Sequence, residues 1–183
     1  DEPPALPDPE ATGDVGLAIE VDGQHRTYRL GVPAEGGDGE PMGLIVNFHG
    51  ATSDAIQTTA YTQMALRGTE RGYVVVTPDA VDGHWDLSGE GPDDDLLLTL
   101  LDDVASRRCI DLDRVHAVGI SLGAWKASVT ACTHPDRFAS LVLVAEEVAP
   151  EDCAMPVVAV HGTADAVVPY GSGADDGVVV TGA

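Results

Sequence analysis

The chain has 183 residues, enough for one domain with a hydrophobic core, and hydrophobic residues make up 44% of it, which excludes a disordered or fibrous protein. The net charge of -22, from 31 acidic and 9 basic residues, argues against nucleic acid as a partner because phosphate would be repelled. No apolar run approaches the roughly 20 residues of a membrane-spanning helix.

The acidic residues are spread along the chain, and Lys126 is the sole lysine. High acidic content with little lysine fits a salt-adapted protein as well as an ordinary acidic secreted protein. Residues 1–14 are acidic and rich in proline, which predicts a flexible lead-in. Residues 15–183 are expected to form a single domain, and we expect a monomer.

The first predicted element is a hairpin between Val15 and Leu30, because two β-rich runs flank the turn pair Asp22-Gly23. Further strands are predicted where short runs are apolar on both faces, a pattern typical of parallel strands buried between helices. These runs are residues 44–48, 73–76, 115–120, 139–144 and 157–160.

Helices are predicted between these strands, over residues 54–71, 92–108 and 121–133. Asp54 is a suitable cap for the first, and Pro92 followed by three aspartates suits the start of the second. The second helix is expected to bury a stripe formed by Leu97, Leu100, Leu101 and Val104. The alternation of strands and helices predicts an α/β fold with a mostly parallel sheet and helices on both faces.

The sequence Gly119-Ile120-Ser121-Leu122-Gly123 is a G-x-S-x-G motif between a predicted buried strand and a predicted helix. In that context the serine lies on a sharp, strained turn that lifts its hydroxyl above the sheet at a helix N-terminus. The flanking glycines leave room for close packing of strand and helix. Ser121 is therefore the candidate nucleophile, and the alternative is a serine that only caps a helix.

A second motif, Phe48-His49-Gly50-Ala51-Thr52, follows an earlier strand. An acyl-transfer enzyme needs backbone N–H donors directed at the developing oxyanion. The N–H of Leu122 is one candidate, and the second is expected from Ala51 or Thr52. His49 is expected to have a structural role rather than to act as the base.

A third motif, His161-Gly162-Thr163-Ala164-Asp165, also follows a predicted strand. The order Ser, acid, His along the chain makes Asp165 the candidate that orients a catalytic histidine. The alternative for Asp165 is an aspartate that only forms a turn.

Together these motifs resemble the polyhydroxybutyrate depolymerase and feruloyl esterase-like branch of the α/β-hydrolases, over roughly residues 15–171. Ala124 departs from this resemblance, since many relatives have another glycine there. The other matching segments are residues 22–29, 48–50, 77–80, 85, 91–94, 110–115, 131–132, 135–139 and 167–170.

The resemblance implies an α/β-hydrolase fold without its C-terminal elements, and a secreted serine esterase that forms an acyl-enzyme on Ser121. It implies Asp165 as the triad acid and the amides of Ala51 and Leu122 as the oxyanion hole. Trp85 would line the substrate cleft, and Thr52 is a second candidate substrate contact. The implied substrates are polyesters, feruloylated or acetylated polysaccharides or small esters, with no cofactor.

No histidine follows Asp165, although the resembling family carries its catalytic histidine there. Serine without a base is a weak nucleophile near neutral pH. Three explanations stay open: the chain is a truncated version of a longer enzyme, another histidine serves, or the protein binds a ligand without catalysis. His84 is the candidate substitute base because it follows the predicted strand at 73–76, and its alternative is an ordinary surface histidine.

Cys109, Cys132 and Cys153 allow at most one internal disulfide, and their spacing does not predict a zinc site or another metal site. All three are expected at the sheet edge opposite Ser121, where strands start and helices end. The resemblance favours the pair Cys132–Cys153, and Cys109–Cys132 is the alternative. A disulfide fits an oxidising compartment.

Overall fold

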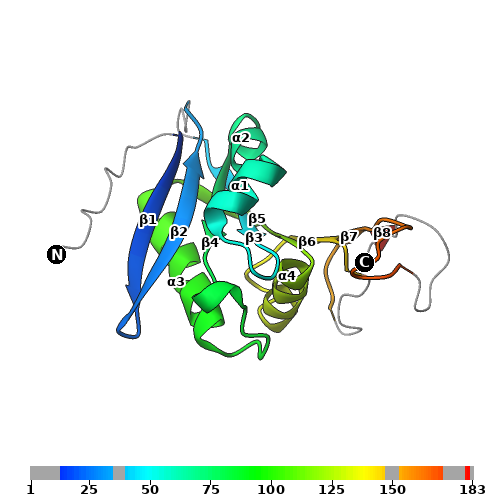
Figure 1. Cartoon of the computed structure of the whole chain (residues 1–183). Coiled ribbons are helices and arrows are strands. Elements are labelled where there is room, and N and C mark those ends of the chain that lie inside the picture. The colour runs from blue at the N-terminus through cyan, green and yellow to red at the C-terminus, as the bar shows by residue number, and fades with distance from the viewer. Residues whose placement is uncertain (1–12, 35–39, 147–152, 171–179, 182–183) are drawn as a thin grey trace.

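The structure is a computed structural model that describes residues 13–34, 40–146, 153–170 and 180–181. One eight-stranded sheet lies between two layers of helices, with α1 and α2 on one face and α3 and α4 on the other (Figure 1). The strands are β1 (Gly13–Val21), β2 (Gln24–Val32), β3 (Met42–Phe48), β4 (Tyr73–Pro78), β5 (Ile110–Ile120), β6 (Ser140–Val144), β7 (Val157–Val160) and β8 (Val180–Thr181).

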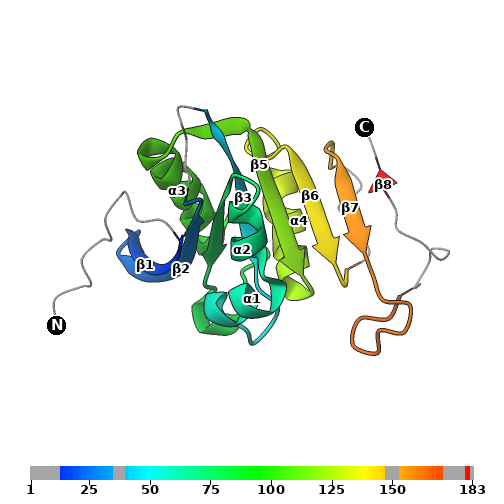
Figure 2. The ribbon, with the colours of Figure 1, turned by 90° about the horizontal axis from the view of Figure 1, so that it is seen from above.

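The strand order is β1-β2-β4-β3-β5-β6-β7-β8. The neighbours from β4 to β7 are parallel, whereas β1, β2 and β8 add antiparallel pairings at the two sides of the sheet. The arrowheads of β5, β6 and β7 therefore point to the same edge, which we call the carboxyl edge (Figure 2). The predicted hairpin and mostly parallel sheet are confirmed, although β1 begins at Gly13, inside the segment predicted as a lead-in.

Alternation along the strands divides their side chains between the two helical layers. In β3, Leu44, Val46 and Phe48 belong to the main core, which also receives the predicted leucine stripe of α3. Ile45 and Val75 lie on the opposite face, where both approach Gly68 of α2. The strands are thus apolar on both faces because each face is covered by helices over the middle of the sheet.

The helices are α1 (Ala55–Thr62), α2 (Met64–Thr69), α3 (Pro92–Arg107) and α4 (Leu122–Thr133), with a short 3-10 turn η1 at Val81–Gly83. The predicted starts at Asp54 and Pro92 are confirmed, since Asp54 accepts a 2.7 Å hydrogen bond from the Gln57 N–H and Pro92 opens α3. In the described ranges no helix has the length and apolar character needed to cross a membrane.

The prediction of one continuous helix over 54–71 is wrong, because Gln63 adopts a left-handed conformation with φ of 54° between α1 and α2. The Thr62 hydroxyl donates to the Thr58 carbonyl at 2.7 Å and accepts from the Met64 N–H at 3.2 Å. Such side-chain bonds offer the backbone an alternative to helical pairing. The local threonine content therefore interrupts a segment whose apolar spacing alone favours one helix.

Candidate active site at the carboxyl edge

Ser121 lies between the last residue of β5 and the first residue of α4, at the carboxyl edge. Its φ and ψ of 53° and -127° are strained for a residue other than glycine. The Ser121 N–H donates to the Val144 carbonyl at 2.8 Å, which holds the turn against the end of β6. The strained serine that the motif predicts is thus present in the fold.

The glycines that flank Ser121 are required by close backbone packing. A Cβ at Gly119 would lie 2.1 Å from the Gly123 carbonyl oxygen, and a Cβ at Gly123 would lie 2.3 Å from the His49 oxygen. Contacts this short do not occur without a shift of the backbone. The two glycines therefore let the start of α4 pack directly on the end of β3, and this packing brings the loop after β3 beside Ser121.

His49 lies at the end of β3 and is completely buried. Its Nε2 accepts a hydrogen bond from the Ala80 N–H at 3.0 Å, which leaves the proton on Nδ1. Nδ1 then donates to the Gly50 carbonyl at 2.8 Å. Both ring nitrogens of His49 are engaged with the backbone, in agreement with the structural role expected from the sequence.

These contacts also orient the peptide group between Gly50 and Ala51. The Gly50 carbonyl points to the His49 ring, so the N–H of Ala51 points the opposite way across a trans peptide. Gly50 itself lies against the nucleophile turn, since a Cβ there would be 3.7 Å from the Ser121 Cβ. The N–H of Leu122, at the first position of α4, has no acceptor within the helix.

The N–H of Thr52 donates to the Gly83 carbonyl at 3.1 Å, so it is already used within the protein. This observation favours Ala51 over Thr52 as the second oxyanion donor, a choice that the sequence left open. The side chain of Thr52 is exposed at the same edge, as a substrate contact requires.

Trp85 does not occupy the position expected of a residue that contacts substrate. Its side chain is only 6% exposed, and its ring packs against Phe48 and His49 with centroid separations of 5.5 and 4.6 Å. The indole N–H donates to the His49 carbonyl at 2.8 Å. We therefore correct the predicted cleft contact: Trp85 lies beneath the loop after β3 and supports it from within the core.

His84 follows η1 in a loop that touches the loop after β3 through the Thr52–Gly83 hydrogen bond. The side chain is exposed, and Nδ1 lies 2.8 Å from the Asp82 carbonyl oxygen. Because a carbonyl only accepts, Nδ1 carries the proton and Nε2 carries the basic lone pair. His84 thus has the tautomer of a general base, but no hydrogen bond joins it to Ser121 in the described part of the chain.

Asp165 lies in the loop after β7, at the same edge. Its Oδ1 accepts hydrogen bonds from the N–H groups of Val167 and Val168 at 2.8 and 3.0 Å. These bonds favour the charged form, the one from Val168 with the larger effect, and hold the pKa of the Asp165 carboxyl below its ordinary value. Asp165 is therefore an ionised carboxylate at neutral pH.

Glu146, just after β6, is a residue of this edge that the sequence analysis missed. Burial raises its pKa to about 7, and Oε2 is buried without a hydrogen-bond partner. The signal that points to it is a glutamate directly after a predicted buried strand, which places a carboxyl group at the edge where parallel strands end.

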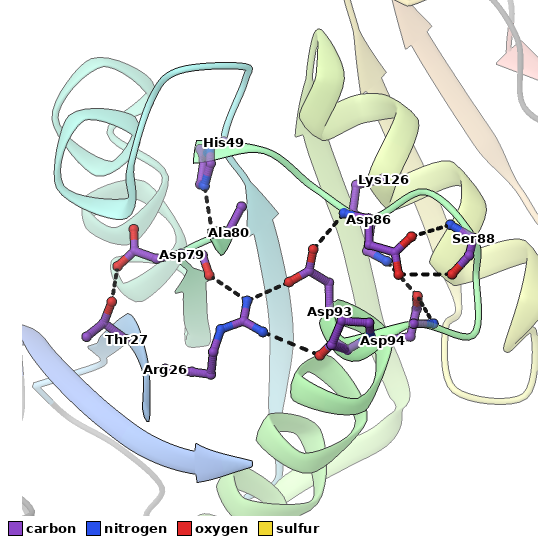
Figure 3. Close-up of polar contacts among 12 residues, drawn as sticks. Arg26, Thr27, His49, Asp79, Ala80, Asp86, Ser88, Asp93, Asp94 and Lys126 are labelled. Atoms are coloured by element: carbon purple, nitrogen blue, oxygen red, sulfur yellow. Dashed lines mark hydrogen bonds and ion pairs between the residues drawn. The ribbon is translucent and has the colours of Figure 1, made fainter. Parts of the chain in front are cut away.

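Buried ion pairs join α3, α4 and β2 below the candidate site (Figure 3). Arg26 pairs with Asp93 and also donates to the Asp79 carbonyl at 3.0 Å. Lys126 pairs with Asp94 at 2.7 Å, and Thr130 donates to the other oxygen of Asp94 at 2.6 Å. Asp93 and Asp94 were predicted only to favour the helix dipole, but both are buried partners of the cations that tie this region together.

The disulfide favoured by the resemblance is present, linking Cys132 at the end of α4 to Cys153 before β7. Cys109 is free and exposed. Within the described ranges, no cluster of His, Cys, Asp and Glu side chains could hold a metal ion.

Comparison with known proteins finds esterases. NocK of Nocardia uniformis subsp. tsuyamanensis, a protein assigned to the esterases, is 28% identical over 83% of this chain and 48% of its own length. Feruloyl esterase B of Piromyces equi is 27% identical over 71% of this chain, and poly(3-hydroxyalkanoate) depolymerase C of Paucimonas lemoignei is 32% identical over 56%. Each of these two matches covers 27% of the relative. No protein-family model matches the chain.

Solved structures of esterases share the fold. A cold-adapted esterase from an Arctic intertidal metagenomic library matches with a TM-score of 0.69 and 19% identity, over 87% of this chain and 76% of its own. A thermostable esterase matches with a TM-score of 0.67 and 20% identity, over 85% and 48%. The chain therefore spans about half the length of NocK and of the thermostable esterase.

Proposed function

We propose that this chain carries the nucleophile of a serine carboxylic ester hydrolase. The premise is that it has the α/β-hydrolase fold and is similar in sequence to a feruloyl esterase and a polyhydroxyalkanoate depolymerase. The observation that carries the proposal is the strained Ser121 turn packed against Gly50. That packing supports the proposal that the Ser121 hydroxyl works with two backbone N–H groups, those of Ala51 and Leu122.

In this mechanism the Ser121 Oγ attacks the ester carbonyl, and the alcohol leaves as the acyl-enzyme forms. Preorganised N–H groups stabilise the negative charge on the carbonyl oxygen, a contribution of typically 10²- to 10³-fold per donor. Water then attacks the acyl-enzyme and releases the acid. His49 acts as a positioning residue because it holds the carbonyl of the Gly50–Ala51 peptide, whose N–H is offered to the oxyanion. Trp85 acts one step further away, since its indole N–H holds the carbonyl of His49.

The mechanism requires a base to accept the proton of Ser121, with Asp165 in place to stabilise the protonated form. Asp165 is ionised and uses Oδ1 for backbone contacts. His84 is the candidate within this chain, and the alternative is a histidine of a longer protein. Secretion is part of the proposal and is supported by the disulfide Cys132–Cys153, since such bonds persist in oxidising compartments.

The test compares the chain with its Ser121→Ala variant in the hydrolysis of p-nitrophenyl acetate and butyrate. We expect the unsubstituted chain to exceed the rate of the variant, while Ser106→Ala, an exposed serine at the far end of α3, leaves the rate unchanged. His84→Ala then decides whether that histidine is the base, because loss of the base lowers the rate while leaving Ser121 in place. Equal rates for the chain and Ser121→Ala would contradict catalysis by this chain on its own, leaving ligand binding or catalysis with a histidine of a longer protein as the alternatives.

Covalent capture gives a second readout of Ser121. Diethyl p-nitrophenyl phosphate should add one diethylphosphoryl group to the folded chain, detected by intact mass, and peptide mapping should place it on Ser121. Addition elsewhere would contradict the assignment of the nucleophile.

A further inference from the structure

Charged side chains are divided unequally between the two edges of the sheet. The loops that follow the parallel strands, residues 49–54, 79–91, 145–146 and 161–170, contain no lysine or arginine. Apart from Glu146, their charged residues are Asp54, Asp79, Asp82, Asp86, Glu90 and Asp165. Each of these loops begins at the edge that carries Ser121, because parallel strands end on the same side, and the 79–91 loop extends at Gly89 to the C-terminal end of α4.

The three cations outside the opposite edge are Arg26, Arg29 and Lys126, and each is paired with a carboxylate, Arg29 with Asp14 at 2.9 Å. Arg26 is 5% exposed and pairs with Asp93, and Lys126 is fully buried and pairs with Asp94 (Figure 3). Each pair is neutral as a unit. Among the acidic side chains of the loops, Asp82 and Glu90 are exposed and the others are half-buried, and the described loops contain no cation.

The opposite edge differs in its composition. Arginines precede or begin β4, β5 and β6 there, mixed with acidic partners such as Glu70, Asp102 and Asp103. They are Arg67, Arg71, Arg107, Arg108, Arg114 and Arg137. Six of the 9 basic residues of the chain thus lie at the edge away from Ser121.

We propose that the acidic loops around Ser121 make this site select uncharged and cationic esters and discriminate against esters that carry a carboxylate beside the scissile bond. The acidic loops alone would not define a site; the strained, half-exposed Ser121 turn does so independently. A surface of one sign raises the local concentration of ligands of the opposite sign and repels those of its own. The selectivity for esters rests on the proposed function, whereas the potential at Ser121 does not.

The potential can be measured without catalysis by placing a thiol at the site. In the double variant Ser121→Cys, Cys109→Ser, the new thiol is the single free thiol, because Cys132 and Cys153 form the disulfide. The rate of its reaction is measured with cationic, neutral and anionic methanethiosulfonates. Each rate is divided by the rate of 2-mercaptoethanol with the same reagent, which corrects for the intrinsic reactivity of the reagent. The unsubstituted chain is the matched control, because its exposed Cys109 lies beside Arg108 at the opposite edge.

At low salt, about 20 mM, we expect the cationic-to-anionic rate ratio at the site to exceed that of Cys109 by at least about fivefold. At about 1 M salt the two ratios should converge, because screening shortens the reach of surface charges to about 3 Å. If Ser121→Cys does not fold, Thr52→Cys combined with Cys109→Ser takes its place. Thr52 is exposed at the same edge. Equal ratios at both edges at low salt would overturn the proposal.

Hydrolysis connects the potential to selectivity. Where Ser121-dependent hydrolysis is measured, the p-nitrophenyl ester of butyrate should be cleaved faster than the p-nitrophenyl monoester of glutarate, and Asp82→Asn should reduce the ratio of the two rates. The matched control, Asp113→Asn, removes one exposed acid at the other edge and should leave that ratio unchanged. If the introduced thiol prefers cationic reagents but no hydrolysis is found, only the proposed function is contradicted. If hydrolysis is found but neither the thiol nor the ester rates depend on charge, only the inference is contradicted.

Discussion

Individual side chains of this protein take roles that depend on what surrounds them. His49 and His84 are both histidines near the carboxyl edge, but the first is fully buried between two backbone groups and the second is exposed. A ring with both nitrogens engaged cannot accept the proton of a nucleophile, so of these two histidines His84 alone retains the basic position of its ring. The same contrast applies to acids, since Asp165 is stabilised as an anion and Glu146 is not.

Glu146 predicts a pH dependence of stability. Its pKa is about 7 in the folded protein, above the ordinary value of 4.5, so its contribution to stability is fully present below pH 4.5 and is lost as pH rises through 7. Glu146→Gln should therefore leave the free energy of unfolding unchanged near pH 4 and raise it at pH 8. After allowance for solvent screening of a partly exposed group, the gain is about 1 to 2 kcal/mol.

Urea denaturation at pH 4, 6 and 8 measures this difference. The control is Asp82→Asn, which removes one exposed acid from the same edge and accounts for the general loss of negative charge. A gain for Glu146→Gln that is equal at all three pH values would argue against titration of this carboxyl.

Secondary-structure elements are joined here by covalent and ionic links as well as by apolar packing. α4 carries two of these links: the ion pair of Lys126 in its first half and the disulfide of Cys132 near its end. The buried pair of Lys126 with Asp94 is costly to break from one side, typically by 3 to 5 kcal/mol, because it leaves an uncompensated charge. These links hold α4 against α3 and against the segment that leads into β7.

The disulfide should stabilise the protein by restricting its unfolded chain. Cys132 and Cys153 are 21 residues apart in sequence, a loop length for which the chain-entropy estimate is about 3 kcal/mol. The double variant Cys132→Ser, Cys153→Ser should lose about that much free energy of unfolding in urea. Cys109→Ser, at an exposed free thiol, should change it by less than about 0.5 kcal/mol. A thiol titration of the unfolded, non-reduced protein that finds three thiols would contradict the disulfide itself.

The molecule as a whole is strongly anionic, with a formal net charge of -22. Repulsion among like charges destabilises a compact chain, and salt screens that repulsion. Ion pairs oppose this effect, but the buried ones, Arg26–Asp93 and Lys126–Asp94, are screened far less than exposed charges. The balance therefore favours stabilisation by salt.

Raising the NaCl concentration from low to molar values should increase Tm by about 3 to 6 °C, corresponding to about 1 to 2 kcal/mol for a chain of this size. Differential scanning calorimetry checks this, with sucrose as a control for general exclusion from the protein surface. A Tm that falls with salt would mean that surface ion pairs outweigh the repulsion, and it would argue against a salt-adapted protein.

Apolar patterning and local turn chemistry were sufficient to predict the order of strands and helices, the strained serine turn and the caps at Asp54 and Pro92. These features depend on residues close together in the chain, so their physical cause can be read in one segment. The break at Gln63 is local too, but it depends on which of two competing hydrogen-bond patterns the threonines adopt, and apolar spacing does not report that competition.

The amino-acid sequence by itself determined a parallel sheet, a glycine-flanked serine at its carboxyl edge and a highly negative charge. Only the tertiary structure decided that Trp85 supports the loop after β3 and that the Thr52 N–H donates to the Gly83 carbonyl. It also decided that Asp93 and Asp94 pair with buried cations. The reason is that burial and hydrogen-bond partners arise from contacts between segments 30 or more residues apart in the chain. Such contacts have no counterpart in the spacing of neighbouring residues.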